Sequence, residues 1–134
     1  MDPGVARRLV EEARVARLAT VSPEGRPHLV PCCFVLVAEV AYTAVDAKPK
    51  STLALRRVAN IRSNPEVSLL VDRYEEDWSL LWWVRLDGRA RIVEDVEEAG
   101  SARAALRAKY PQYGRVAMPG PIIAVEVARS ASWP

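Results

Sequence analysis

The stretch that decides the fold is AYTAVDAKPKSTLALRRVANIRSNPEVSLLVD, residues 41–72. It begins in β-branched and aromatic residues, which are typical of a strand, and we predict a strand over 38–45. A polar loop over 46–52 follows, and then an apolar stripe at helical spacing that Pro65 ends. The residues EVSLLVDR, 66–73, predict the next strand. The stretch therefore indicates a strand, a loop, a helix and a second strand in succession.

The residues upstream predict a helix and a hairpin. Apolar residues recur near helical spacing over 4–14, which indicates a short amphipathic helix. Two apolar runs then flank Ser22-Pro23-Glu24-Gly25, in which proline suits the first central position of a turn and glycine tolerates a positive φ after it. We predict a hairpin with strands over 16–21 and 27–37.

The residues downstream complete a mainly β pattern. Residues 79–94 predict one long strand, or two strands bent at Asp87-Gly88. A helix is expected over 95–109 and a last strand over 122–128. About six strands at close intervals, with two or three helices, are typical of a small antiparallel barrel that carries helices. We expect one such domain over 1–134.

The composition excludes several classes of protein. Half of the 134 residues are hydrophobic and 27% are charged, which excludes disordered and collagen-like sequences. The net charge of +2 is too small to indicate nucleic-acid binding. No apolar run approaches the roughly 20 residues of a membrane helix. Acids and arginines interrupt the N-terminal segment, so we expect no secretory signal and a cytoplasmic protein.

The residues suited to catalysis or metal binding are few. Cys32 and Cys33 are adjacent, so a disulfide between them would be strained, and we expect reduced thiols. His28 is the only histidine, which excludes a structural zinc site. No acid–base pair or catalytic triad is indicated by spacing. If the protein is an enzyme, a cofactor is expected to supply the difficult chemistry.

The polar loop ahead of the predicted helix is the best candidate for an anion site. Lys48 and Lys50 place two ammonium groups close to the hydroxyls of Ser51 and Thr52. Cations, hydroxyl donors and the free N–H groups at a helix start together suit a phosphate. The same residues also fit a solvated loop in which a hydroxyl caps the helix.

A pair of tryptophans is the second unusual feature. Trp82 and Trp83 are consecutive in a predicted strand, so one indole faces the core and the other faces away from it. The outward indole fits an interface or a flat ligand, and it equally fits ordinary packing with partial exposure. Trp78 and Trp133 add aromatic surface that a small core does not readily absorb.

These residues resemble the FMN-binding split-barrel family, which includes pyridoxamine 5′-phosphate oxidase. The resemblance is carried by Tyr42-Thr43 at a strand end, by the basic loop and helix, and by NPEVSLLV, residues 64–71. LATVSPEGRPHLVPCCF is similar to the family's opening hairpin, and VRLDGRARIVED to its later strand pair centred on glycine. The resemblance implies a six-stranded antiparallel split β-barrel that forms homodimers, with cofactor sites across the subunit interface.

A narrower resemblance concerns the cofactor. YTAVDAKPK, EDWS and WWVRLDG are similar to an actinobacterial subgroup of F420-dependent enzymes. Coenzyme F420 is a deazaflavin that carries a phosphate-linked tail and transfers hydride from C5. The resemblance implies an F420-dependent oxidoreductase that acts on a small organic substrate. An FMN-dependent reductase or oxidase on the same fold, and a flavin- or haem-binding module without turnover, are the alternatives.

The resemblance also implies a set of cofactor-binding residues. Lys50 takes the position of the family's phosphate-binding lysine. The other implied positions lie in the same loop, at the end of the preceding strand, on the second hairpin strand and at the tryptophan pair: Lys48, Ser51, Thr52, Tyr42, Thr43, Val30, Pro31, Cys32 and Trp83. Trp83 falls where pyridoxamine phosphate oxidases have a glutamine that reaches the flavin from the second subunit.

Overall fold

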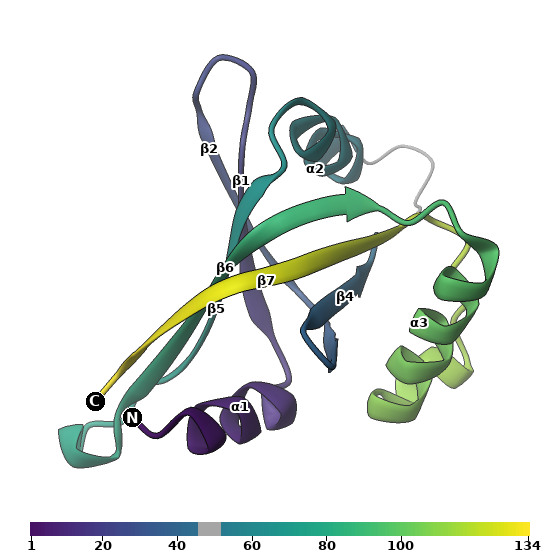
Figure 1. Ribbon diagram of the computed structural model, residues 1–134. Coiled ribbons are helices and arrows are strands. Elements are labelled where there is room, and N and C mark those ends of the chain that lie inside the picture. Colours follow the sequence, from purple (N-terminus) through teal and green to yellow (C-terminus); the bar gives the residue numbers. More distant parts are fainter. Residues whose placement is uncertain (46–51) are drawn as a thin grey trace.

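The computed structural model describes residues 1–45 and 52–134, with the backbone alone for 52–55. The described residues form three α-helices, two short 3-10 helices and seven strands (Figure 1). The helices are α1 (Pro3–Glu12), α2 (Thr52–Ser63), α3 (Val96–Lys109), η1 (Trp78–Leu80) and η2 (Pro111–Gly114). The strands are β1 (Ala16–Val21), β2 (Pro27–Cys32), β3 (Val35–Val37), β4 (Val40–Ala44), β5 (Glu66–Arg73), β6 (Trp82–Ile92) and β7 (Ile122–Trp133).

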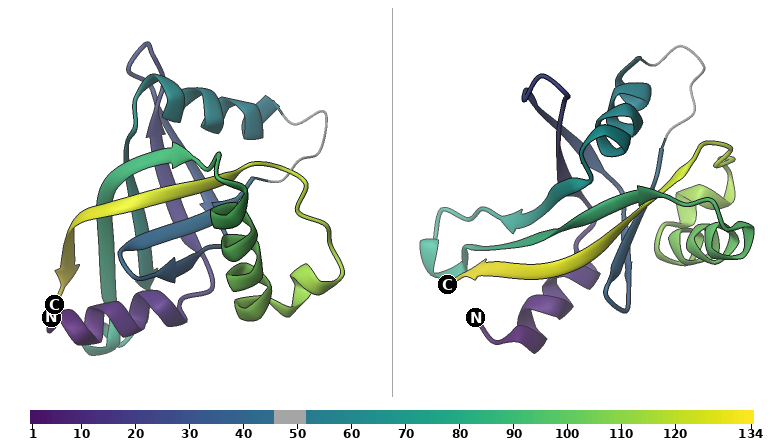
Figure 2. Two further views of the ribbon diagram at one scale, coloured as in Figure 1. Left: turned by 45° about the vertical axis from the view of Figure 1, so that its right-hand side comes forward. Right: turned by 45° about the horizontal axis from the view of Figure 1, so that its top comes forward.

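The strands form one antiparallel sheet whose two edges are joined by the chain itself. The strand order is β2-β1-β5-β6-β7-β4-β3, so β2 and β3 are the opposite edges. Only Cys33 and Phe34 separate them in the sequence. Two linking residues span at most about 11 Å from the end of one strand to the start of the next. The sheet must therefore curl until its edges meet, which gives the half-barrel of Figures 1 and 2.

The prediction of one strand over 27–37 was wrong, and this raises the number of strands from six to seven. The chain leaves β2 after Cys32 and starts β3 at Val35, on the other edge of the sheet. The residues of the link are apolar, like the strands beside them, so the local pattern does not reveal the break. The break is stabilised by contacts with residues that are distant in the sequence.

Tyr110 provides the main contact of this kind. Its hydroxyl accepts a hydrogen bond from the backbone N–H of Phe34 at 3.1 Å. It also donates toward the carbonyl of Arg14 at 2.9 Å and that of Phe34 at 3.1 Å. On the other side of the link, the Thr43 hydroxyl donates to the carbonyl of Cys33 at 2.7 Å. The backbone of the link thus finds partners outside the sheet ladder.

The long strands β6 and β7 hold the middle of the sheet. Of the two predicted forms of 79–94, the structure has one strand, with a register shift against β7 at Asp87 and Gly88. A Cβ on Gly88 would lie 2.2 Å from the carbonyl oxygen of Glu126, so only glycine fits there. Strand β7 continues to Trp133, beyond the predicted end at residue 128, because its polar residues pair with β6.

The three α-helices cover different parts of the curled sheet. Helices α1 and α2 lie at its opposite ends (Figures 1 and 2), where Val10 and Ile61 join the core that the inner faces of the strands form. Helix α3 packs on the outside of β3, β4 and β7, and its Leu106 is fully buried with Ile122 in a second apolar cluster. None of the described helices is both long and apolar enough to span a bilayer.

The hydrogen bonds of Tyr110 to the strand link lead to a stability prediction. We expect Tyr110→Phe to lower the free energy of unfolding by about 1–3 kcal/mol, because it removes the partner of buried backbone groups of Phe34. The nearby Tyr113→Phe serves as the control and should change it by less than about 0.5 kcal/mol, as for a substitution that breaks no backbone contact. Urea unfolding of both variants measures the difference. Equal losses in the two variants would contradict the role given to Tyr110.

Candidate functional site

Two of the residues implied by the resemblance come together beside the strand link. Strand β4 places Thr43 toward the interior, where it is buried, with its hydroxyl bonded to the Cys33 carbonyl. Cys32 is buried on the inner face of β2. Burial raises the pKa of the Cys32 thiol, while the Thr43 side chain and the charge of Arg57 act to lower it. Cys32 and Thr43 thus lie together beside the link, and Arg57 on α2 is near enough for its charge to act on the Cys32 thiol.

Helix α2 brings positive charge to this point, and the sequence reasoning missed the residues that carry it. Burial, Arg56 and Arg57 together lower the pKa of His28 on β2. Arg57 Nε and His28 Nδ1 are both buried and have no hydrogen-bond partner among the described residues. A usable signal was present, because two arginines interrupt the apolar stripe of the predicted helix one to two turns after the basic loop.

The other implied residues lie in several places. Val30 is half-buried on the inner face of β2, whereas its neighbour Pro31 is exposed on the outer face. Thr52 is the first residue of α2, so it stands where a capping or anion-binding residue is expected. Lys48, Lys50 and Ser51 lie outside the described residues. The roles of all these residues remain predictions.

Tyr42 lies on the opposite face of β4 from Thr43, because side chains alternate along a strand. It packs against the α3 cluster, and its hydroxyl donates to Glu98 at 2.7 Å. Arg91 forms two further bonds of 2.7 Å to the same carboxylate. The bonds from Arg91 and Tyr42 lower the pKa of Glu98 to about 2. The Tyr42 hydroxyl thus helps hold α3 on the sheet, while Thr43 faces the strand link.

An open groove runs across the outer face of the sheet on the side that α3 leaves uncovered. It has a volume of about 480 Å³, and its floor includes Leu29, Leu70 and Trp83 from β2, β5 and β6. Leu29 is 66% exposed. As the alternation of the strand requires, Trp82 packs against the core while Trp83 faces outward. Trp83 therefore shares no face with Cys32 or Thr43 within one chain.

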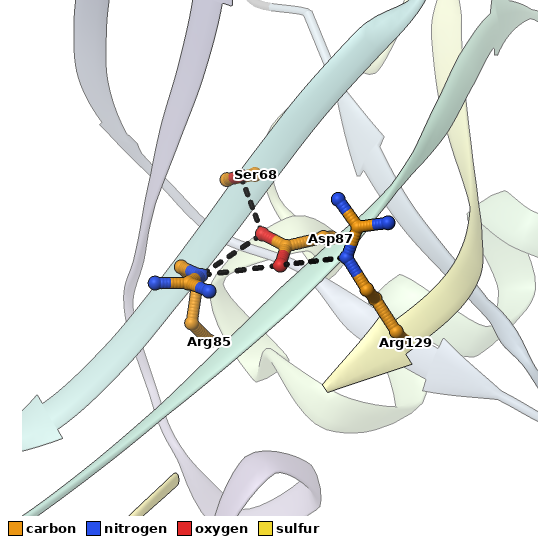
Figure 3. Close-up of polar contacts among 4 residues, drawn as sticks. All are labelled: Ser68, Arg85, Asp87 and Arg129. Atoms are coloured by element: carbon orange, nitrogen blue, oxygen red, sulfur yellow. Dashed lines mark hydrogen bonds and ion pairs between the residues drawn. The ribbon is translucent and has the colours of Figure 1, made fainter. Parts of the chain in front are cut away.

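A buried carboxylate lies next to this groove on the same outer face (Figure 3). Asp87 accepts hydrogen bonds from Ser68 at 2.6 Å and from Arg85 at 3.0 and 3.2 Å. Arg129 on β7 adds an ion pair at 3.5 Å. The Ser68 bond, opposed by burial and assisted by the two arginines, lowers the pKa of Asp87. The cluster ties β5, β6 and β7 together and leaves a net positive charge beside the groove.

The described residues favour anion binding over metal binding or acid–base catalysis. Within the described part of the chain, no three metal-ligating side chains gather. The Asp87 carboxylate is fully engaged with Ser68 and two arginines, so it is not placed to move a proton. What the site offers is positive charge from α2, polar backbone at the strand link and an apolar outer face.

A family model decides the classification. The model described as pyridoxamine 5′-phosphate oxidase matches residues 3–133. The chain belongs to that family. The match covers nearly the whole sequence, so the resemblance of its strand, loop and helix motifs extends to the complete fold. Comparison with curated proteins finds no match.

Solved structures of the same fold carry different descriptions. A conserved hypothetical protein from Mycobacterium tuberculosis is 23% identical with a TM-score of 0.81, over 99% of this chain and 84% of that one. The haem storage protein HutZ from Vibrio cholerae is 20% identical with a TM-score of 0.74, over 98% and 92%. A FAD-binding protein from Mesorhizobium loti is 18% identical with a TM-score of 0.74, also over 98% and 92%. At these identities the likeness concerns the fold.

The Asp87 cluster gives a prediction about stability and pH. Because the folded-state pKa of Asp87 lies below its ordinary value of 3.8, the ionised carboxylate stabilises the fold at neutral pH, and this contribution is lost as the pH falls below about 4. We expect Asp87→Asn to lower the free energy of unfolding by about 1–3 kcal/mol at pH 7. The difference from wild type should shrink toward pH 2.

Asp72→Asn is the matched control, because Asp72 pairs with Arg17 at 3.0 Å but both side chains are more than 40% exposed. Such a pair contributes at most about 1 kcal/mol. Chemical denaturation at several pH values compares the two variants. A loss for Asp87→Asn that does not depend on pH would show that its charge is not the cause.

Proposed function

We propose that this protein is a homodimeric oxidoreductase that binds coenzyme F420 and passes hydride between it and a small organic substrate. The observation that carries the proposal is the positive charge that α2 directs at β2. There, Arg57 Nε and His28 Nδ1 lack hydrogen-bond partners among the described residues, and the charge of Arg57 acts on both His28 and Cys32. Lys48 and Lys50 precede the same helix in the sequence.

This arrangement fits a cofactor with an anionic tail. A buried N–H group such as Arg57 Nε is unfavourable without an acceptor, and a phosphate or carboxylate oxygen would satisfy it. Lys50, Ser51 and Thr52 at the start of α2 would hold the phosphate, and Arg57 would extend the positive field along the helix. Bound F420 would supply hydride chemistry at C5 of its deazaflavin ring. The protein would position the ring and exclude water from it.

F420 is preferred over FMN because of the quoted motifs around the basic loop and the tryptophan pair. Trp83 stands where the pyridoxamine phosphate oxidases have glutamine, so their substrate does not carry over to this chain. FMN remains the second candidate, since the family description names an oxidase and a FAD-binding protein shares the fold. Both cofactors carry a phosphate, and the same basic residues would serve either one.

A haem-binding role has less support. Haem storage is the description of HutZ, which shares the fold at 20% identity. Iron in haem proteins is held most often by histidine, and this chain has only His28. The two neighbouring arginines help lower the pKa of its ring. Their positive charge would also oppose a cationic iron at that place.

The outer groove supports the dimer. Leu29, Leu70 and Trp83 form an apolar floor that no described helix covers, and ion pairs such as Arg17–Asp72 lie at its border. An apolar centre with a charged border is typical of a protein interface. A two-fold dimer through this face would bury the same apolar residues, Trp83 among them, against their counterparts in the partner.

The cofactor proposal predicts that truncating the basic residues weakens binding. We expect Lys50→Ala to raise the dissociation constant for F420 roughly 10- to 150-fold, the effect of losing a charge-assisted contact. Arg57→Gln should raise it at least about fivefold for the same reason. Lys48→Ala should matter less, and its effect should fade with added salt. Fluorescence titration of the purified protein with F420 and with FMN measures each change.

Arg62→Gln is the control on the same helix, because Arg62 is exposed in its last turn. It should leave both dissociation constants within about twofold, as expected of a screened surface charge. If Lys50→Ala and Arg57→Gln bind both cofactors as tightly as wild type, the anion site lies elsewhere. If neither cofactor binds the wild-type protein, the proposal itself is wrong.

The dimer proposal predicts an effect of charge in the groove. Light scattering should give wild type about twice the 14.8 kDa mass of the chain. Leu29→Asp should produce monomers at micromolar concentration, because an unpaired carboxylate would be buried in the interface. Val96→Asp is the control, since Val96 is 84% exposed on α3, away from the groove. A monomeric wild type, or a Leu29→Asp variant that stays dimeric, would exclude this face as the interface.

A further inference from the structure

A second cavity opens beside the strand link, at the C-terminal end of α3. It has a volume of about 380 Å³ and is lined by residues from the segments before β1, after β2 and after α3: Arg14, Cys33, Tyr110, Gln112, Tyr113 and Val116. None of these residues lines the outer groove. They have no role in the proposed cofactor site or dimer face.

Two cations stack on aromatic rings here: Arg14 lines the cavity, and Lys109 is buried next to Tyr110, outside the lining. The Arg14 guanidinium lies 4.6 Å from the centre of the Tyr110 ring and donates to the carbonyl of Lys109 at 2.9 Å. The Lys109 ammonium lies 3.9 Å from the centre of the Phe34 ring and 5.3 Å from that of Tyr110. Cation–π contacts of this kind hold both charges in place.

The Lys109 ammonium, unlike the Arg14 guanidinium, makes no hydrogen bond among the described residues. Its Nζ is buried. Burial, with a smaller contribution from Arg14, lowers its pKa to about 8, so it is still mostly charged at pH 7. The nearby carboxylate of Glu11 is already paired with Arg7 at 2.7 Å. The six cavity residues include no carboxylate. The cavity wall therefore carries the positive charge of Arg14 without an acidic partner, and the Lys109 charge is buried close to it.

Cys33 presents its thiol to this environment, and its neighbour Cys32 does not. Cys33 is exposed and lines the cavity, whereas Cys32 is buried on the inner face of β2. The link turns the chain between the two edges of the sheet, so the two side chains face different surroundings. Burial and the adjacent Cys33 raise the pKa of Tyr113 to about 12, which keeps that phenol protonated beside the sulfur. A thiolate at Cys33 would thus share the cavity with the Arg14 guanidinium and a neutral phenol, within the electrostatic influence of Lys109.

We propose that Cys33 is a thiol-exchange site that reacts with disulfides carrying carboxylates, such as oxidised low-molecular-weight thiols, and that the charge of Arg14, with that of the buried Lys109 added to it, recruits their carboxylates. The Cys33 thiol loses its proton to solvent, and the thiolate attacks one sulfur of the disulfide. A new sulfur–sulfur bond forms to Cys33 as the old bond breaks, and the other half leaves as a thiolate. Cys33 is oxidised, and the departing sulfur is reduced.

The charge of the reagent and the pair of adjacent cysteines make the proposal testable. The dianionic Ellman disulfide should react with wild type in a fast phase of one thiol per chain, followed by absorbance and mass spectrometry. Cys33→Ala should abolish the fast phase, and Cys32→Ala should keep it, because a buried thiol reacts slowly. Oxidised glutathione should give a single adduct at Cys33.

A second set of variants tests whether the charges of Arg14 and Lys109 speed the reaction with an anionic disulfide. Arg14→Gln and Lys109→Met should each lower the rate with the dianionic reagent by about threefold or more, an effect that added salt should reduce in wild type. The rate with neutral dithiodipyridine should change by less than about twofold. Arg8→Gln, an exposed site on α1, is the control and should change neither rate.

Two results would overturn the proposal. One is a Cys33 thiol that reacts no faster than Cys32 in the folded protein. The other is a ratio of anionic to neutral rates that stays at the wild-type value in both cation variants, with urea unfolding showing that they are folded. Because the test uses neither F420 nor FMN, its outcome does not depend on the proposed cofactor.

Discussion

The whole sheet depends on a covalent constraint at Cys33 and Phe34. These two residues join strands at opposite edges of a seven-stranded sheet, so the sheet can form only if it curls. The curl encloses the main core and leaves two ends, which α1 and α2 close. It also turns part of the backbone away from the ladder, and Tyr110 and Thr43 supply the missing hydrogen bonds. The residues of greatest functional interest surround this point: Cys32 and Thr43 on one side of the link, Cys33 and Tyr110 on the other.

Helix α3 divides the outer surface of the sheet into a covered and an uncovered region. Helix α3 covers β3, β4 and part of β7, and the Tyr42–Glu98–Arg91 contacts hold it there. The other strands keep an uncovered apolar groove beside the buried Asp87 cluster. A second subunit on this groove would give the outward Trp83 a partner, and it would leave the cavity of Cys33 as a separate feature. Because one helix buries its region and no described helix covers the other, the chain keeps an apolar groove on its surface.

Local sequence signals predicted much of the fold. Strands β1 and β5 lie where periodicity placed them, at 16–21 and 66–73, and Asn64-Pro65 follows directly after α2. The break after Cys32 could not be predicted, because the groups that stabilise it, on Thr43 and Tyr110, are far away in the sequence. The full length of β7 was missed because Arg129 to Ser132 are polar and adopt extended structure only by pairing with β6. For the candidate site, the sequence indicated Cys32, Thr43 and Trp83 but not Arg57, whose relevance depends on where α2 meets β2.

The length of β7 has a consequence for how the protein behaves at high concentration. Residues 122–126 are hydrogen-bonded to strands on both sides, whereas beyond Val127 the strand pairs, among the described residues, with β6 alone. An open strand edge can recruit an edge of another molecule and start a fibril. Here the register shift after Asp87 twists the strand, and Arg129, Ser130 and Ser132 make the edge charged or polar where a steric zipper needs apolar side chains. The same bulge that shapes the Asp87 cluster thus protects the molecule from growing into a continuous sheet.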